Sequence, residues 1–409
     1  MHITIFTDTY LPKIDGIAIS VERFCRLLSE KGHTFTICCP RYPDLEDYKG
    51  TSAVKIIRFK NASLPSYPDV KVVMPSRKRI RAAFNDPKPD LVHIQTPGLL
   101  GQFGINAAKH YGVPVTGTYH TMINEMGTYL NPLRLLKIDK LFSKLTLKSK
   151  KKKKLQKAER KKPKSLTNKV LMKITNSVYE RGVCILSPTD LIRQELVRTG
   201  VKTPIEVVSN GIELDKFKFN AKSGNVESPR LLHVGRLSFE KNVSVVLRAF
   251  VQILKKKPKA RLSVIGDGPA LPALRTEAQN LEIGDSVDFP GFIPNSDLPG
   301  IYPQYDLFVT ASTMETQGLV VLEAMACGLP VVGVNSYALP ELIQNNVNGY
   351  LLEPFDIQGM AAKVLQTLDD PETMERFSKE SRKLAETHDV HQCAQKLESI
   401  YEKVAGKKY

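Results

Sequence analysis

The sequence predicts an α/β protein built from two doubly wound parallel sheets. Short runs of β-branched residues alternate with longer segments of helical periodicity through most of the 409 residues, as parallel strands joined by crossover helices do. The length allows two domains with ample cores, and a new cycle of strands begins near residue 205. We therefore expect Rossmann-like domains over residues 1–205 and 206–389 that face a cleft, with ligands at the carboxyl ends of the strands.

The predicted strands are short and apolar, and glycine or polar residues follow many of them. They span residues 2–6, 34–39, 54–58, 91–95, 113–119 and 183–187 in the first half, and 205–208, 230–234, 260–265, 286–289, 307–310, 330–334 and 349–352 in the second. Helices fill the intervals between them. The clearest runs from Ile19 to Glu30 with apolar residues along one face, and it stops at Gly32.

The positive charge is concentrated in one segment. The formal net charge is +17, and residues 134–173 hold seventeen basic residues against two acidic ones. The rest of the chain is therefore close to neutral, which excludes a uniformly basic surface that coats nucleic acid.

The cysteines and the N-terminus bear on the cellular compartment. The six cysteines are scattered through mostly apolar segments without a C-x-x-C pair, which favours reduced, buried thiols and a cytoplasmic enzyme. The first strand meets Asp8 before the apolar core of a signal peptide could form, and no apolar stretch is long enough to span a membrane. We expect neither a targeting peptide nor a membrane span.

The richest motif is the stretch from Ala311 to Pro330. It follows a strand and opens a helix at about Gln317, whose unpaired N–H groups and aligned dipoles suit a phosphate or diphosphate. Glu315 precedes this helix, Glu323 lies about two turns inside it, and both carboxylates can accept hydrogen bonds from sugar hydroxyls. A nucleotide sugar fits both features. One alternative is that Glu315 and Glu323 are ordinary acidic residues on the surface. A catalytic acid and base of a hydrolase is another, but it would leave the anion site unexplained.

Two cations follow another strand end. Arg236 and Lys241 come after the predicted strand 230–234 and could bind diphosphate oxygens, although a solvated pair is an equal alternative. Gly266 and Gly268 form a third glycine turn at the same edge of the sheet. The full dinucleotide fingerprint is missing, which disfavours a nicotinamide enzyme.

The first half offers two further candidates. Gly16 precedes a helix start, where the backbone could approach a phosphate, or it forms a simple turn. His120 follows the strand 113–119, and its neutral imidazole could bind a sugar hydroxyl or a reacting oxygen; a structural histidine is the alternative. His93 lies inside a strand and is interpreted as structural.

Taken together, these motifs resemble the retaining family-four glycosyltransferases of the GT-B architecture over essentially the whole chain. The motifs that carry the resemblance are Gly16 in the first loop, His120 in TYHT, VVSNGIELDKF, HVGRLSFEKN, VIGDGP and the Glu315/Glu323 stretch. FTDTYLPKIDGIAISV and ETQGLVVLEAMA are most similar to the bacterial diacylglycerol glucosyltransferases and related glycolipid synthases. By the same analogy, residues 390–409 are expected to pack back on the first domain.

The resemblance implies roles for individual residues. Catalysis would involve His120, Glu315, Arg236 and Lys241. The donor would be bound by Gly16, Arg236, Lys241, Gly268, Phe292, Ile293, Glu315, Thr316, Gln317, Gly318, Leu319 and Glu323. Thr316-Gln317-Gly318 replaces the common Gly-Phe-Gly, a departure shared with the lipid-glucosylating branch. The family needs no metal, and no cofactor beyond the nucleotide-sugar substrate is expected.

The basic segment predicts membrane contact. Apolar residues recur at helical spacing over residues 135–145, with lysines between them, and a lysine run follows. The predicted membrane-binding residues are Lys137, Lys140, Lys144, Lys150, Lys151, Lys152, Lys153 and Lys154. The alternatives are a solvated insertion or a helix docked on the first domain. Aromatic residues are sparse there, so RNA binding has little support.

We therefore predict a cytoplasmic hexosyltransferase, peripheral on the inner face of the cell membrane. It would move glucose from UDP-glucose, with retention, onto diacylglycerol or a related lipid. One alternative is a mannosyltransferase acting on a phosphatidylinositol-type lipid or a polysaccharide precursor. The other is a non-catalytic polyanion-binding protein on the same fold. The expected partners are a nucleotide sugar, a lipid acceptor and an anionic membrane surface, and no nucleic acid is expected.

Overall fold

Two units make up the chain. The computed structural model describes residues 1–409 except 44, 47, 65–66, 86, 121–165, 224–226 and 407–409. Unit 1 comprises Met1–Ser187, Arg193–Val207 and Leu397–Tyr409, and unit 2 comprises Pro188–Ile192 and Val208–Lys396. The chain crosses from unit 2 into unit 1 for the last time inside helix α17 (Val390–Ala405).

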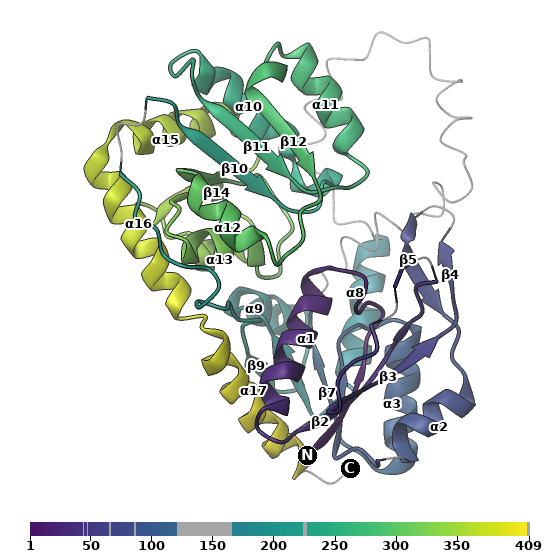
Figure 1. Cartoon of the computed structure of the whole chain (residues 1–409). Coiled ribbons are helices and arrows are strands. Elements are labelled where there is room, and N and C mark those ends of the chain that lie inside the picture. The colour runs from purple at the N-terminus through teal and green to yellow at the C-terminus, as the bar shows by residue number, and fades with distance from the viewer. Residues whose placement is uncertain are drawn as a thin grey trace, which may run out of the picture. The chain divides into compact units, whose positions relative to one another are not determined.

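Unit 1 is built on a seven-stranded parallel sheet (Figure 1). Its order is β3-β2-β1-β6-β7-β8-β9. The strands are β1 (His2–Phe6), β2 (Thr34–Pro40), β3 (Val54–Phe59), β6 (Leu91–Ile94), β7 (Val115–Thr118), β8 (Cys184–Ser187) and β9 (Ile205–Val207). The strand at Ile205 was expected to open the second set, but it pairs with β8 and so closes the first sheet.

Helices and one hairpin complete unit 1. The helices are α1 (Gly16–Ser29), α2 (Arg77–Asn85), α3 (Leu99–Tyr111), α8 (Leu166–Tyr179) and part of α9 (Asp190–Arg198). The antiparallel hairpin of β4 (Asn61–Leu64) and β5 (Tyr67–Val73) was not predicted, because its polar residues break the apolar pattern. Helix α3 ends at Gly112, whose φ of 66° gives the left-handed conformation that glycine adopts readily.

Unit 2 is built on a six-stranded parallel sheet in the order β12-β11-β10-β13-β14-β15. The strands are β10 (Arg230–Val234), β11 (Arg261–Ile265), β12 (Val287–Gly291), β13 (Leu307–Val309), β14 (Val331–Val334) and β15 (Gly349–Leu352). The helices are α10 (Val243–Leu254), α11 (Leu271–Asn280), α12 (Leu298–Ile301), α13 (Leu319–Ala326), α14 (Leu339–Leu342), α15 (Ile357–Asp369) and α16 (Pro371–Glu386), with 3-10 turns η2 (Phe239–Lys241), η3 (Gly284–Ser286) and η4 (Tyr302–Gln304).

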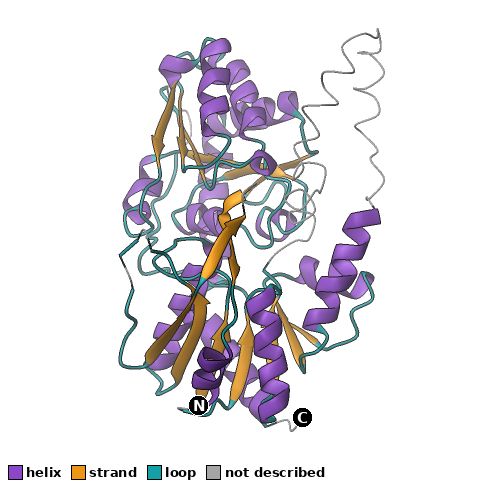
Figure 2. Cartoon of the chain, turned by 90° about the vertical axis from the view of Figure 1, so that its right-hand side faces the viewer, coloured by secondary structure: helices purple, strands orange, loops and turns teal. Residues whose placement is uncertain are grey.

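Helices lie on both sides of each sheet (Figure 2), so both strand faces are buried, as the apolar strand sequences require. The predicted α/β class with two parallel sheets is confirmed. All six cysteines are buried, and none of them forms a disulfide. Within the described ranges, no helix combines the length and apolar character needed to cross a membrane.

The strand order reverses once in each sheet. In unit 1 the chain runs outward from β1 through β2 and β3 and then returns to the other side of β1 at β6. In unit 2 it runs from β10 through β11 and β12 and returns at β13. Loops diverge at such a reversal, and ligands of α/β proteins bind there, outside the carboxyl ends of the strands.

Candidate functional site

Lys241 and Glu315 meet at the reversal point of unit 2. Lys241 ends the η2 turn that follows β10, and Glu315 lies in the loop between β13 and α13. Their Nζ and Oε1 atoms are 2.7 Å apart, and the side chains are 19% and 15% exposed. The pair therefore holds a cation and a carboxylate, partly shielded from water, at the position where this fold binds ligands.

Asn242 ties the two loops of this site together. Its φ of 49° places it in the left-handed region, where asparagine is among the better tolerated residues. Its Nδ2 donates to the carbonyl of Ala311 at 3.2 Å and to Oγ1 of Thr313 at 3.1 Å. The loop that carries Arg236 and Lys241 is thereby fixed to the loop that carries Glu315. Arg236 is exposed in this loop.

Glycine turns at the ends of β10, β11 and β12 pack backbone against backbone. The N–H of Gly235 donates to Ile265 at 3.0 Å, and the N–H of Gly266 donates to Gly291 at 2.9 Å. A Cβ on Gly266 would lie 1.9 Å from the carbonyl oxygen of Gly235, and one on Gly268 would lie 2.5 Å from that of Leu237. Only glycine fits at these two positions, because Gly266 and Gly268 also have φ angles above 130°.

Replacing Gly266 with alanine is expected to destabilise unit 2 by about 1–3 kcal/mol, because the new Cβ displaces the turn that carries Arg236. Thermal unfolding measures this loss, and sugar transfer should fall with it. Gly300→Ala is the control, since its Cβ meets nothing within 4 Å. Equal unfolding midpoints for both variants would contradict the close backbone approach.

Helix α13 begins with an uncapped N-terminus. It starts at Leu319, so Glu323 lies about one turn inside it, nearer the start than the predicted two turns. Gly318 precedes it with a φ of 82° and no side chain to cap the first N–H groups. The N–H groups of such a first turn suit an anion.

The side chain of Gln317 points into a buried network. It is 2% exposed, and its Oε1 accepts the N–H of Asn210 at 2.9 Å while its Nε2 donates to Oγ of Ser209. Nδ1 of His388 lies 3.0 Å from the same Oγ. Only the backbone of Gln317 therefore remains available for the predicted donor role. Thr316 uses its carbonyl to accept a hydrogen bond from Thr189 at 3.2 Å.

Glu323 is buried with a tyrosine partner. The carboxylate is 4% exposed, and the hydroxyl of Tyr302 donates to its Oε2 at 2.7 Å. Burial raises the pKa of Tyr302 well above its ordinary value, so the phenol keeps its proton. Of the predicted donor-binding residues after β12, Phe292 is 56% exposed and Ile293 packs against the core.

In unit 1, Asp15 caps helix α1 beside the predicted Gly16. Its Oδ1 accepts the N–H groups of Ile17 at 3.1 Å and Ala18 at 2.9 Å, and Thr9 donates to its Oδ2. The carboxylate thus occupies two of the N–H groups that an anion at this terminus would use. Gly16 is the first residue of the helix, and its donor role stays a prediction.

His120 contacts a buried glutamine at the reversal point of unit 1. Its Nε2 lies 2.6 Å from Oε1 of Gln95, which follows β6. Burial lowers the pKa of His120 to about 4, so the imidazole is neutral near pH 7. Burial and the nearby His120 lower the pKa of His93 to about 3. The contacts of His93 are those of a structural residue, since its two ring nitrogens form hydrogen bonds with the buried hydroxyls of Tyr401 and Thr118.

Asp8 is a candidate site residue that was not predicted from the sequence. It follows β1, and Thr96 Oγ1 after β6 donates to its Oδ2 at 2.7 Å, across the reversal point. Burial raises the pKa of Asp8 to about 6. A carboxyl with a raised pKa at a ligand-binding edge marks a functional candidate. Its only signal in the sequence is an acidic residue directly after a strand.

The stability of unit 1 is expected to fall on acidification. The unfolded His93 imidazole binds a proton near pH 6.5 but the folded one only near pH 3, so lowering the pH favours the unfolded state. This contribution is complete above pH 6.5, and about 2 kcal/mol of it is lost by pH 5. Urea unfolding at pH 7.5 and pH 5 measures it. His93→Gln should reduce the slope, whereas exposed His110→Gln should not; identical slopes would refute the assignment.

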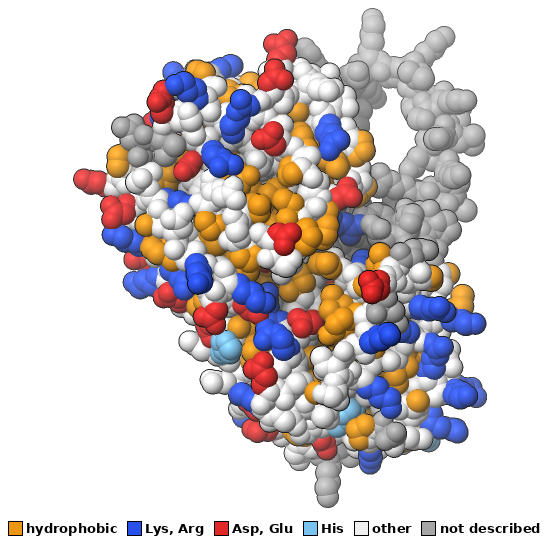
Figure 3. All heavy atoms as spheres, in the orientation of Figure 1, with side chains coloured by type: hydrophobic (Ala, Val, Ile, Leu, Met, Phe, Trp, Pro, Cys, Tyr) orange, Lys and Arg blue, Asp and Glu red, His pale blue; other side chains and the backbone are white. Residues whose placement is uncertain are grey.

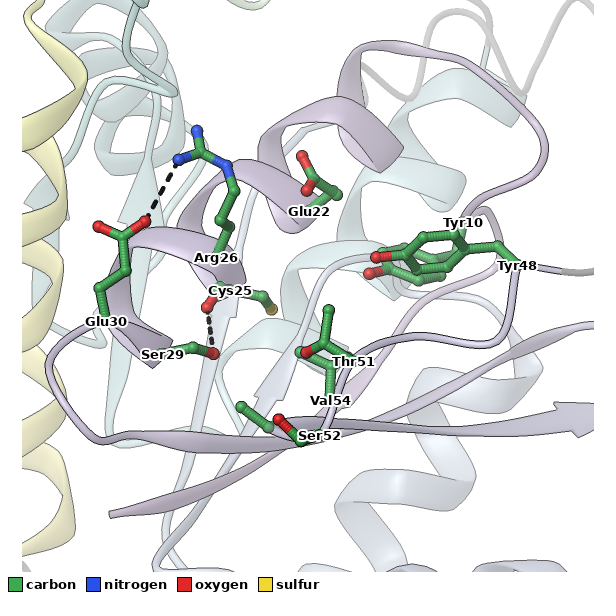
Figure 4. A pocket seen from close by; sticks show the side chains of 11 residues that line it. Tyr10, Glu22, Cys25, Arg26, Ser29, Glu30, Tyr48, Thr51, Ser52 and Val54 are labelled. Atoms are coloured by element: carbon green, nitrogen blue, oxygen red, sulfur yellow. Dashed lines mark hydrogen bonds and ion pairs between the residues drawn. The ribbon is translucent and has the colours of Figure 1, made fainter.

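A cavity of about 340 Å³ opens in unit 1 between α1 and residues 48–54 (Figure 4). Tyr10 and Tyr48 form one wall, with ring centroids 6.2 Å apart in an edge-to-face arrangement. No predicted site residue within the described part of the chain lines it. The first residue of α1 that lines the cavity is Glu22, which lies about 9 Å along the helix axis from Gly16. The cavity is therefore built from residues other than those of the predicted site.

Two family models match the chain in succession. "Glycosyltransferase Family 4" matches residues 14–216, and "Glycosyl transferases group 1" matches residues 215–384. An alpha-monoglucosyldiacylglycerol synthase of Streptococcus pneumoniae is 30% identical over 90% of this chain and 78% of its own length. The chain belongs to glycosyltransferase family 4.

Other proteins match over most of the chain. An alpha-monoglucosyldiacylglycerol synthase of Acholeplasma laidlawii is 24% identical, covering 98% of this chain and 96% of its own. Among solved structures, sucrose-phosphate synthase of Thermosynechococcus elongatus has a TM-score of 0.75 at 18% identity, with 98% of each chain covered. Anabaena HepE in complex with UDP-glucose has a TM-score of 0.72 at 17% identity, covering 98% of this chain and 100% of its own. The structures share the GT-B fold with this chain.

Membership in glycosyltransferase family 4 confirms the resemblance inferred from the motifs. The structure brings Lys241 into contact with Glu315 and places Arg236 in the same loop. Gly16 and His120 lie in unit 1. The predicted membrane-binding lysines, from Lys137 to Lys154, lie outside the described residues. The described residues contain no group of three or more side chains suited to a metal ion.

Proposed function

We propose that this glycosyltransferase moves glucose from UDP-glucose, with retention, onto diacylglycerol or a related membrane lipid. The observation that carries the proposal is the Lys241–Glu315 pair at the reversal point of unit 2. The two synthases named above support the acceptor class, because their names specify alpha-monoglucosyldiacylglycerol. An α-linked product from an α-linked donor corresponds to retention.

In the proposed reaction, the bond between the anomeric carbon and the β-phosphate oxygen breaks as the lipid hydroxyl attacks from the same face. The hydroxyl proton passes to the departing diphosphate. Arg236, Lys241 and the N-terminus of α13 stabilise the charge that develops on this leaving group. Glu315 orients the transferred sugar through its hydroxyls, and neutral His120 accepts a hydrogen bond from another hydroxyl. Glu323 binds the ribose.

The test is transfer by the purified protein from radiolabelled UDP-glucose, UDP-galactose and GDP-mannose to diacylglycerol or phosphatidylinositol in mixed micelles. We expect glucosyl transfer from UDP-glucose to diacylglycerol, with an α-anomeric signal in the proton NMR spectrum of the product. A β-linked product would contradict retention. Absence of transfer from every donor would contradict the proposed activity and favour the polyanion-binding alternative.

A mannosyltransferase is the second candidate. A GDP-mannose-dependent alpha-mannosyltransferase of Corynebacterium glutamicum is 24% identical over 90% of this chain and 81% of its own length. Both candidates use the same cation and carboxylate arrangement, so the donor panel separates them. Preference for GDP-mannose with phosphatidylinositol as acceptor would establish the second candidate in place of the first.

Peripheral membrane association is part of the proposal, on the cytoplasmic face where the nucleotide sugar is available. Lys and Arg side chains gather over α2 in unit 1 (Figure 3). The exposed cations of this helix are Arg77, Lys78, Arg79 and Arg81, while Ile80, Ala83 and Phe84 are buried. Each cation near an anionic bilayer contributes about 1 kcal/mol of binding free energy. The segment 134–173 would add to this attraction.

Neutralising the four α2 cations with glutamine is expected to weaken binding to phosphatidylglycerol vesicles at least tenfold, as measured by co-sedimentation. Replacing Lys150 to Lys154 tests the second segment in the same assay. The matched control replaces four exposed cations of unit 2: Arg248, Lys255, Lys256 and Lys259. Binding of the wild-type protein should weaken with salt, and equal binding to neutral phosphatidylcholine vesicles would rule out the electrostatic contact.

A further inference from the structure

A column of polar side chains lies behind His120 in unit 1. Gln95 is 5% exposed, and its Oε1 lies 2.6 Å from Nε2 of His120. An amide oxygen only accepts hydrogen bonds, so Nε2 of His120 carries a proton and donates it to Gln95. In a neutral ring the other nitrogen, Nδ1, then holds the lone pair.

His93 fixes the other end of the Gln95 amide. Nε2 of Gln95 lies 3.2 Å and 3.3 Å from the two ring nitrogens of His93. Both in-plane nitrogen positions of His93 are taken by hydroxyls, so an amide nitrogen at these two distances lies over the face of the ring. The π electrons of that face attract an amide N–H and repel an amide oxygen. The amide is thus oriented with its nitrogen toward His93 and its oxygen toward His120.

The His93 ring is itself held on both sides. Its Nδ1 lies 2.7 Å from the hydroxyl of Tyr401, and its Nε2 lies 2.7 Å from Oγ1 of Thr118. Both partners are buried, with Tyr401 2% and Thr118 6% exposed. Rotation of the ring would break both bonds at a buried position, which is costly. The column therefore runs from α17 through His93 and Gln95 to His120.

We infer that Gln95 is a positioning residue that keeps the proton of His120 on Nε2 and leaves Nδ1 as the acceptor for a substrate hydroxyl. The inference rests on the proposed function, which places a sugar hydroxyl at His120. Either nitrogen of a neutral imidazole can carry the proton. Without Gln95 the ring samples both tautomers, and Nδ1 accepts a hydrogen bond only in one of them.

The first test uses the wild-type protein without substrate. Long-range ¹H–¹⁵N correlation spectra of the imidazole rings distinguish the two neutral tautomers by their pair of nitrogen shifts, and the His120→Asn variant assigns the signal. At pH 7.5 we expect His120 to be neutral with the proton on Nε2. A proton on Nδ1 would mean that the Gln95 amide is reversed, and this would overturn the inference whether or not the protein transfers sugar.

The second test replaces Gln95 with methionine, which keeps the shape of the side chain and removes the acceptor. The His120 signal should shift toward mixed tautomers, and kcat should fall about tenfold, the effect of one neutral hydrogen bond. Gln102→Met, on α3 of the same unit, is the control and should match the wild type in both measurements.

The outcomes separate the inference from the proposed function. A wild-type kcat together with an unchanged ring spectrum in Gln95→Met would overturn the positioning role. A lower kcat with an unchanged tautomer would also overturn it, because the loss would then be structural. Absence of transfer by the wild-type protein would contradict the proposed function but not the inference about Gln95, since the ring spectra need no substrate.

Discussion

Replacing Lys241 with alanine is expected to lower kcat about 100-fold to 1,000-fold, the range seen when one preorganised charge-stabilising group is removed from an active site. The ammonium is held 2.7 Å from Glu315 at the reversal point of unit 2, so it is oriented before the donor binds. In the proposed reaction, charge develops on the diphosphate as its bond to the anomeric carbon breaks, and the effect therefore falls mainly on kcat. Steady-state transfer from UDP-glucose measures it.

Lys257 provides a closely matched control. It pairs with Asp369 at the same distance of 2.7 Å and is 18% exposed, against 19% for Lys241. Lys257→Ala should leave kcat unchanged. Both variants should unfold within about 1 kcal/mol of the wild type, since partly exposed ion pairs contribute little to stability. Wild-type turnover in Lys241→Ala would falsify the assignment of the diphosphate site.

Replacing Glu323 with glutamine is expected to raise KM for UDP-glucose about 10-fold to 100-fold, because hydrogen bonds to a carboxylate contribute about 1.5–3 kcal/mol. The glutamine oxygen can still accept from Tyr302, so the buried packing around residue 323 is retained. Initial-rate kinetics with saturating lipid acceptor separates KM from kcat. Binding of free UDP, measured by calorimetry, should weaken by a similar factor.

Glu277→Gln is the control for this change. Glu277 lies on α11 of the same unit, accepts hydrogen bonds from Ser244 and Arg248, and is 22% exposed. Its variant should keep the wild-type KM. If Glu323→Gln also kept it, the ribose assignment would be wrong, and the buried carboxylate would have only its structural role beside Tyr302.

The parts of the fold and site that depend on local pattern were predictable. An apolar run that ends in glycine located β10, and an apolar run followed by small and polar residues located β13. Because parallel strands place their carboxyl ends at one edge of the sheet, Lys241 and Glu315 could be expected at the same edge. The strand order could not be read in the same way, because pairing partners are distant in sequence. Hence the strand at Ile205 was assigned to the wrong sheet.

The directions of side chains could not be predicted from the sequence. The backbone amide of Gln317 is predicted to bind the donor, and no motif indicated that its side chain is buried against Ser209 and Asn210. Gln95 and Tyr401 are 306 residues apart and share no motif, yet both contact His93. Long-range hydrogen bonds of this kind leave no periodicity in a single sequence, so only the packed structure shows them.

Helix α17 begins in unit 2 and ends in unit 1, and this determines where the junctions of a chimera of this enzyme must lie. Unit 1 resumes at Leu397, and the residues after it include Tyr401, which bonds to His93, and Glu398, which lies 3.0 Å from Nε2 of His33. If unit 1 were borrowed from a relative with a single junction near Val207, its sheet would be packed against a final helix from a different protein. Exchange of unit 1 therefore requires a second junction inside α17, between Lys396 and Leu397.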